Sequence, residues 1–95
     1  MIHILLLEDD ASLVTGLTFA FRKEGFAMTT ARTLAEANAL WGKDACVLLV
    51  LDVSLPDGSG FVFCRTVRRT SRVPILFLTA SDEEMNIIMG LELGG

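Results

Sequence analysis

Three acidic residues stand where two apolar segments of the chain end. Glu8 and Asp9 follow the apolar run 2–7, and Asp52 closes the run 47–51. A buried carboxylate without a partner costs several kcal/mol or more, so something must meet the charge of Asp52. If the two runs are neighbouring parallel strands, their carboxyl ends bring Glu8, Asp9 and Asp52 into one crevice.

Converging carboxylates predict a cation site. At a separation of about 4 Å two carboxylates repel by roughly 1 to 4 kcal/mol, so they stay ionised together only if a cation binds. All-oxygen ligation with an open geometry suits Mg²⁺, which keeps some of its water and accepts a phosphate oxygen. Asp52 is then a ligand alone or also a nucleophile, because carboxylates form aspartyl phosphates.

A further apolar run, residues 74–79, ends at Thr79. If it is the next strand, the Thr79 hydroxyl could donate a hydrogen bond to a phosphoryl oxygen, and the small Ala80 leaves the crevice open. Two other acids have simpler interpretations. Asp10 is expected to be a helix N-cap, and Asp57 is expected to serve the turn of the Pro-Asp-Gly stretch.

Strand and helix patterns alternate along the chain. Apolar runs predict strands at residues 2–7, 26–30, 47–51 and 74–79, and a spacing of three and four predicts helices at 10–24, 33–41 and 61–69. A Ser-Asp-Glu-Glu capping box at 81–84 predicts a last helix through about residue 93. This order favours a parallel sheet covered by helices on both faces.

Composition limits the function classes. The 95 residues suffice for one small domain, and their net charge of −4 argues against nucleic acid as the chain's own partner. The apolar runs are too short to span a membrane, and the N-terminus lacks the cationic start of a signal peptide. A cytoplasmic location is therefore expected.

The stretches ILLLEDD, LLVLDVSLPDGSG and PILFLTAS, in this order, resemble the receiver domain of bacterial two-component response regulators. The final GLELGG is similar to regulators that carry a C-terminal winged-helix DNA-binding domain. The resemblance implies a flavodoxin-like, three-layer α/β/α fold with a parallel sheet of order 2-1-3-4, to which the family adds a fifth strand and a fifth helix.

The resemblance also implies site residues. Asp52 would accept a phosphoryl group from a histidine kinase and so regulate a DNA-binding effector, without the domain being an enzyme beyond its own phosphorylation and dephosphorylation. Mg²⁺ would be held by Asp9 and Asp52 directly, by Glu8 through water, and by the main-chain carbonyl of Ser54. Thr79 would be the switch hydroxyl, with Ala80 beside it.

The family pattern has a Lys at the end of its fifth strand, and no Lys follows Lys43 in this chain. We therefore interpret residues 1–95 as a receiver domain incomplete at its C-terminus, in which 74–79 is an exposed edge strand. Such an edge is a template for pairing, so a homodimer or self-association is expected.

Three alternatives stay open. A Mg²⁺-dependent aspartyl-phosphate phosphatase of the haloacid-dehalogenase type would want a second acid at position 54, where Ser stands. A nucleotide-binding Rossmann unit would want a glycine-rich turn after the first strand, where EDDAS stands. The third alternative is a dimerising module that is not competent for phosphorylation.

Overall fold

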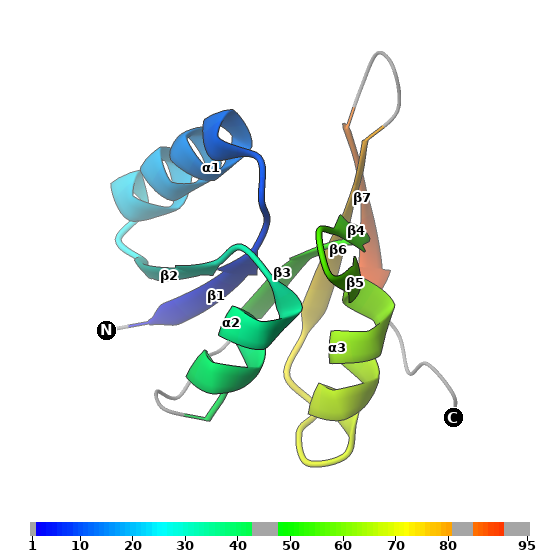
Figure 1. The fold of residues 1–95 in the computed structure, drawn as a ribbon. Helices are drawn as coiled ribbons and strands as arrows, with labels where there is room; N and C mark the ends of the chain where they lie inside the picture. The colour runs from blue at the N-terminus through cyan, green and yellow to red at the C-terminus, as the bar shows by residue number, and fades with distance from the viewer. Residues whose placement is uncertain (1, 43–47, 81–84, 91–95) are drawn as a thin grey trace.

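A five-stranded sheet forms the middle layer of the molecule (Figure 1). The structure is a computed structural model that describes residues 2–42, 48–80 and 85–90, with only the backbone described at 79, 80 and 85–90. The strands are β1 (His3–Leu7), β2 (Ala27–Ala31), β3 (Leu48–Asp52), β6 (Ile75–Ala80) and β7 (Met85–Gly90). Their order is β2-β1-β3-β6-β7. Strands β2, β1, β3 and β6 are parallel to one another. They correspond to the four predicted strands, and their order confirms the predicted order 2-1-3-4.

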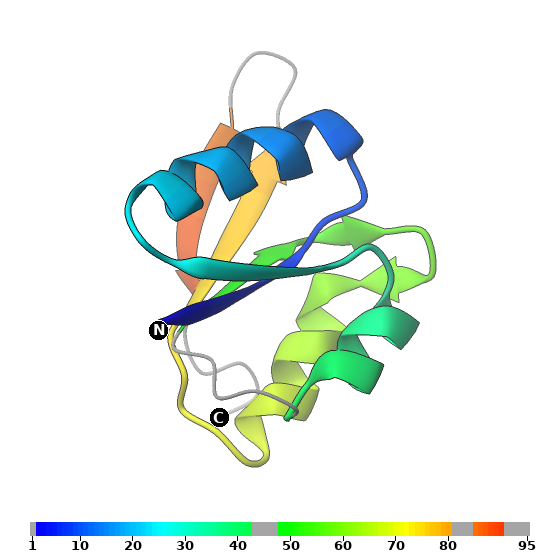
Figure 2. The same cartoon turned by 90° about the vertical axis from the view of Figure 1, so that its left-hand side faces the viewer.

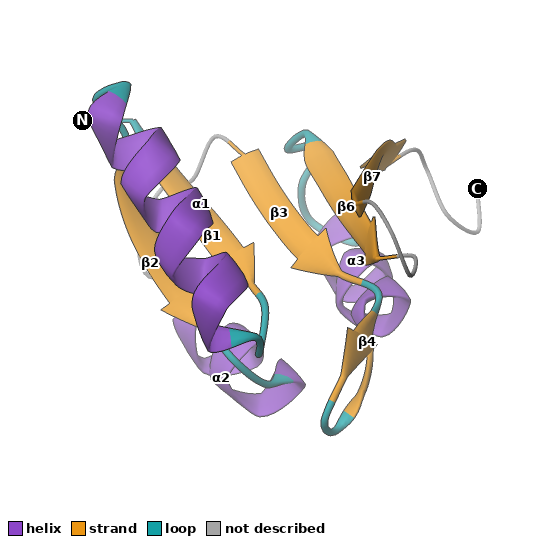
Figure 3. Cartoon of the chain, turned by 90° about the horizontal axis from the view of Figure 1, so that it is seen from above, coloured by secondary structure: helices purple, strands orange, loops and turns teal. Residues whose placement is uncertain are grey.

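Helices cover both faces of this sheet, as Figures 2 and 3 show. Helix α1 (Ala11–Lys23) lies on one face, and α2 (Leu34–Leu40) and α3 (Gly60–Arg68) lie on the other. Between β3 and α3 the chain forms a small hairpin of β4 (Ser54–Leu55) and β5 (Gly58–Ser59), which the sequence did not predict. The flavodoxin-like three-layer fold is confirmed.

Alternate residues of the central strands build two cores. Leu5 and Leu7 of β1 join the core under α2 and α3, whereas Ile4 and Leu6 join the core under α1. Because both faces of β1 are covered, its sequence is a nearly continuous apolar run rather than an alternating one. The position of the strand end, and thus of Glu8, is fixed by this burial.

Local signals define the helix ends. The Asp10 side chain caps α1 by accepting a hydrogen bond from the amide of Leu13 at 3.0 Å, as predicted. The Thr33 hydroxyl accepts from the amide of Glu36 at 3.1 Å and so caps α2. After α1, Gly25 adopts a φ of +92°, a left-handed conformation that a residue without Cβ reaches at little cost.

The predicted last helix is wrong over residues 85–90, which form β7 antiparallel to β6. The physical reason is the edge of β6, whose unpaired backbone groups are satisfied when β7 pairs along its whole length. The two consecutive isoleucines of β7 also suit a strand better than a helix. The rest of the predicted helix lies outside the described residues. The prediction that residues 74–79 form an exposed edge is therefore wrong as well.

The part of the chain that the structure describes holds no helix long and apolar enough to cross a membrane.

Candidate functional site

The register of the sheet brings three acidic side chains together. Leu7 of β1 pairs with Leu51 of β3, so the residues that follow them, Glu8 and Asp52, lie side by side beyond the carboxyl ends of the two strands. Glu8, Asp9 and Asp52 each offer a carboxylate oxygen, and these oxygens all lie within 4.8 Å of one another. Among the described residues this is the only cluster of side chains that could hold a metal ion.

The three carboxylates differ in environment. Glu8 is only 3% exposed, whereas Asp9 is exposed and Asp52 is half-buried. The Glu8 carboxylate accepts hydrogen bonds from the amides of Asp9 and Asp10, each at 3.0 Å. Burial raises the pKa of Glu8 from its ordinary value of 4.5 to about 7, and the charge of Asp52 adds to this effect while the Asp10 amide opposes it. Without a cation, the protonated and ionised forms of Glu8 therefore coexist near neutral pH.

This raised pKa predicts a pH dependence of folding. Because the folded pKa of Glu8 exceeds the unfolded one, its proton stabilises the fold fully below about pH 4.5, and this contribution is lost as the pH rises through about 7. We expect the free energy of unfolding in the presence of a chelator to fall from pH 5 to pH 8 in the native chain. In Glu8→Gln, whose amide mimics the protonated acid, the fall should be smaller. Urea unfolding at several pH values checks this, and parallel pH profiles would contradict it.

Backbone contacts fix the segment after Asp52. The amide of Ser54 donates a hydrogen bond to Asp52 Oδ1 at 3.3 Å, and the amide of Gly60 donates to the carbonyl of Val53 at 2.9 Å. A Cβ at position 60 would lie 2.0 Å from the carbonyl oxygen of Asp52. Only glycine fits there, so the close return of the chain at Gly60 packs directly behind the Asp52 backbone.

Asp57 does more than the turn role expected of it. Its carboxylate accepts hydrogen bonds from the amides of Leu34 at 2.8 Å and Ala35 at 3.2 Å, in the first turn of α2. The Leu34 amide holds the pKa of Asp57 below its ordinary value. Nothing in the local sequence indicates this partner, because it lies 23 residues away along the chain.

The other predicted residues are placed only in part. Asp52 pairs with Leu78 in the sheet, so Thr79 and Ala80 continue β6 just past the level of Asp52. The contacts predicted for their side chains lie outside what the structure describes. Ser54 begins β4, with its amide toward Asp52 as described above.

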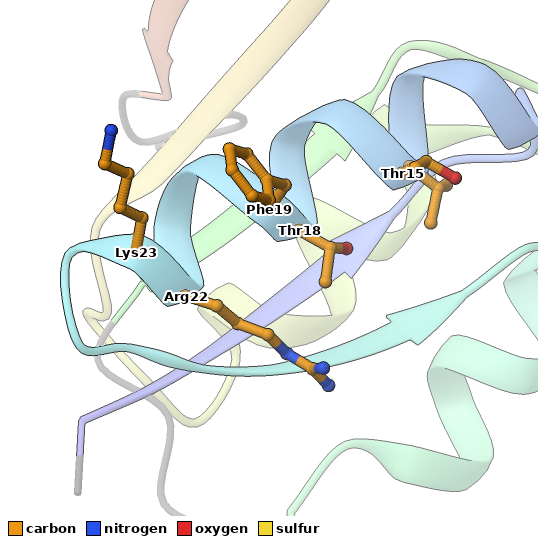
Figure 4. Close-up of a pocket in the computed structure, with 6 residues that line it drawn as sticks. Thr15, Thr18, Phe19, Arg22 and Lys23 are labelled. Atoms are coloured by element: carbon orange, nitrogen blue, oxygen red, sulfur yellow. The ribbon is translucent and has the colours of Figure 1, made fainter.

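A hollow of about 620 Å³ runs along α1 (Figure 4). Its described lining combines apolar, hydroxyl and cationic side chains: Val14, Thr15, Thr18, Phe19, Arg22 and Lys23. None of these side chains is a carboxylate, so the hollow does not offer the ligands that a hard cation needs. Within the described residues, cation chemistry belongs to the acidic cluster.

Comparisons with known proteins point to one family. The family model described as "Response regulator receiver domain" matches residues 4–95. The transcriptional regulatory protein AfsQ1 of Streptomyces coelicolor is 37% identical over 94 residues, which are 99% of this chain and 42% of that protein. The chain thus spans about two fifths of the length of this relative.

Solved structures agree with this match. The non-phosphorylated HemR receiver domain of Leptospira biflexa has a TM-score of 0.78 and 36% identity, over 88% of this chain and 68% of that one. The MaeR response regulator bound to beryllium trifluoride has a TM-score of 0.77 and 32% identity, over 87% of this chain and 70% of that one.

Proposed function

Because the chain belongs to the response regulator receiver domain family, we propose that it accepts a phosphoryl group on Asp52 from a histidine kinase. The observation that carries this proposal is the placement of Asp52 at the end of β3, with carboxylate oxygens of Glu8 and Asp9 within 4.8 Å. The chain acts as a phosphoacceptor in the bacterial cytoplasm rather than as an enzyme. Regulation of a DNA-binding effector belongs to the longer proteins of the family, of which AfsQ1 is named a transcriptional regulator.

The donor set fits Mg²⁺. One carboxylate oxygen from each of Glu8, Asp9 and Asp52 lies within 4.8 Å of the others, and oxygen ligands gathered in this way suit a hard cation that keeps some of its water. Asp9 and Asp52 would hold the ion directly, Glu8 would hold it through water, and the main-chain carbonyl of Ser54 would add a ligand. When bound, the ion supplies positive charge that lets the three carboxylates stay ionised and that offsets the charge of an incoming phosphoryl group.

The chain's own residues account for the transfer. An oxygen of the Asp52 carboxylate attacks phosphorus, forming an O–P bond as the N–P bond to the donor histidine breaks, and the imidazole leaves with the electron pair. The Ser54 amide, which donates to Oδ1 of Asp52, holds the carboxylate in one orientation. We propose that the Thr79 hydroxyl contacts the phosphoryl oxygens afterwards, with Ala80 leaving room for them.

Incubation with acetyl phosphate tests the proposal without the need to know the kinase. We expect the intact mass to increase by one phosphoryl group when Mg²⁺ is present and not when a chelator is present. An unchanged mass under both conditions would count against the proposed function.

We also propose that the chain self-associates. The contact would not be the edge of β6, because β7 pairs with that edge. The basis of this proposal is the exposure of large apolar side chains, of which Phe19 on α1 is 69% exposed. Sedimentation velocity at high micromolar concentration should show a species larger than the monomer, and Phe19→Asp should reduce its share. A single monomeric species for the native chain would refute this proposal.

A further inference from the structure

The hairpin β4–β5 connects the acidic cluster to helix α2. At its base, the amide of Ser54 donates to Asp52 Oδ1, and the amide of Gly60 closes the segment onto the carbonyl of Val53. At its tip, Asp57 accepts from the amides of Leu34 and Ala35 at 2.8 and 3.2 Å. One short segment thus touches the phosphoacceptor at one end and α2 at the other.

An apolar contact accompanies the polar one. A Cβ built on Gly58 would lie 2.7 Å from Cδ1 of Leu34, so the hairpin backbone rests directly against this side chain. Leu55 of the hairpin is buried in the same core against which Leu34 packs. The hairpin is therefore seated on the first turn of α2 by a carboxylate and by packing together.

The segment before α2 also reaches the other side of the acidic cluster. The amide of Glu8 donates to the carbonyl of Ala31 at 2.9 Å, and α2 begins three residues later at Leu34. Both carboxylate-bearing segments, the one with Glu8 and the one with Asp52, are thus held against residues 31–35. A change at the start of α2 can be transmitted to both.

We propose that Asp57 is a positioning residue for the acidic cluster. Asp57 fastens the hairpin to α2 and so holds the Ser54 backbone in place. In that place the Ser54 amide orients Asp52, and the Ser54 carbonyl would face a bound cation. This inference rests on the proposed function. It goes beyond helix capping, because Thr33 already caps α2 through the amide of Glu36. The hairpin strands have two residues each, too few to hold their own geometry in water, so the anchor at the tip, together with the packing of Leu55, helps to set the position of the base.

The coupling must act in both directions. If the anchor at Asp57 strengthens cation binding by some factor, then cation binding strengthens the anchor by the same factor. The amides of Leu34 and Ala35, which donate to Asp57, should therefore exchange with solvent more slowly when Mg²⁺ is bound. Because a bound ion also stabilises the whole fold, this slowing should exceed that of the Glu36 amide, which donates to the other cap of α2, Thr33.

The test compares two variants that each remove one cap of the same helix. Asp57→Ala removes the hairpin anchor, whereas Thr33→Ala removes the intrahelical cap and leaves the hairpin untouched. Mg²⁺ titrations followed by the NMR shifts of the Asp9 and Asp52 amides should show about tenfold weaker binding for Asp57→Ala, as for the loss of other supporting contacts around a metal. Thr33→Ala should bind within about twofold of the native chain. Asp57→Asn, which keeps one acceptor oxygen, should fall between.

The outcomes separate this inference from the proposed function. If the native chain binds Mg²⁺ and the two alanine variants lose affinity equally or not at all, Asp57 is only a cap and the inference is wrong. Unchanged exchange of the Leu34 and Ala35 amides on Mg²⁺ binding would also overturn it. If the native chain itself binds no Mg²⁺, the proposed function fails, and the positioning role fails with it.

Discussion

Phosphoryl incorporation from acetyl phosphate should fall by about a hundredfold or more when Asp52 is replaced by asparagine, because the amide cannot act as the nucleophile. Asparagine has nearly the same size as aspartate and can still accept from the Ser54 amide, which donates to Oδ1 in the native chain. The fold should therefore persist. Intact-mass spectrometry after a fixed incubation measures the effect.

The matched control is Asp10→Asn, two residues beyond Glu8. This substitution removes one negative charge near the cluster, as Asp52→Asn does. Asparagine is also a favourable N-cap residue, so α1 keeps its cap. Incorporation in Asp10→Asn should stay within a few-fold of the native level. If Asp52→Asn is phosphorylated as fast as this control, the assignment of Asp52 is wrong.

The largest effect on stability is expected from Gly60→Ala. The added Cβ would lie 2.0 Å from the carbonyl oxygen and 3.1 Å from the carbonyl carbon of Asp52, and backbone atoms cannot turn aside as a side chain could. We expect the free energy of unfolding to fall by about 3 kcal/mol or more. In any variant protein that still folds, Mg²⁺ binding should weaken, because relief of the clash moves Asp52.

Gly16→Ala provides the control for this prediction. Gly16 lies inside α1, and a Cβ there would have no heavy atom within 4 Å. Alanine should stabilise this helix by about 0.5 to 1 kcal/mol relative to glycine. Urea unfolding of both variants decides the matter, and equal stability of Gly60→Ala and the native chain would contradict the close packing behind Asp52.

Patterns that are local in sequence predicted most of the fold and the cluster. Continuous apolar runs mark strands buried on both faces, so the ends of β1 and β3, and with them Glu8 and Asp52, could be located before the structure was known. The alternation with helices then predicts that these strands run parallel, so that their carboxyl ends lie at the same edge of the sheet. This is why the convergence of the carboxylates was predictable.

What depends on distant contacts was not predictable. The capping box at 81–84 indicated a helix, but residues 85–90 pair with β6, a partner that no local pattern identifies. The anchor at Asp57 joins residues 23 positions apart, and the two-residue strands of its hairpin are too short for any periodicity to show. Likewise, the local sequence does not show whether Glu8 or Asp9 is buried, and only the packing reveals that it is Glu8.

The most direct test of the central claim is to locate the phosphoryl group. After phosphorylation with acetyl phosphate and Mg²⁺, borohydride reduction converts an aspartyl phosphate to homoserine, and peptide mass spectrometry identifies the position. We expect homoserine at position 52 and aspartate at positions 9, 10 and 57. Homoserine at any of those other positions, or at none, would contradict this expectation.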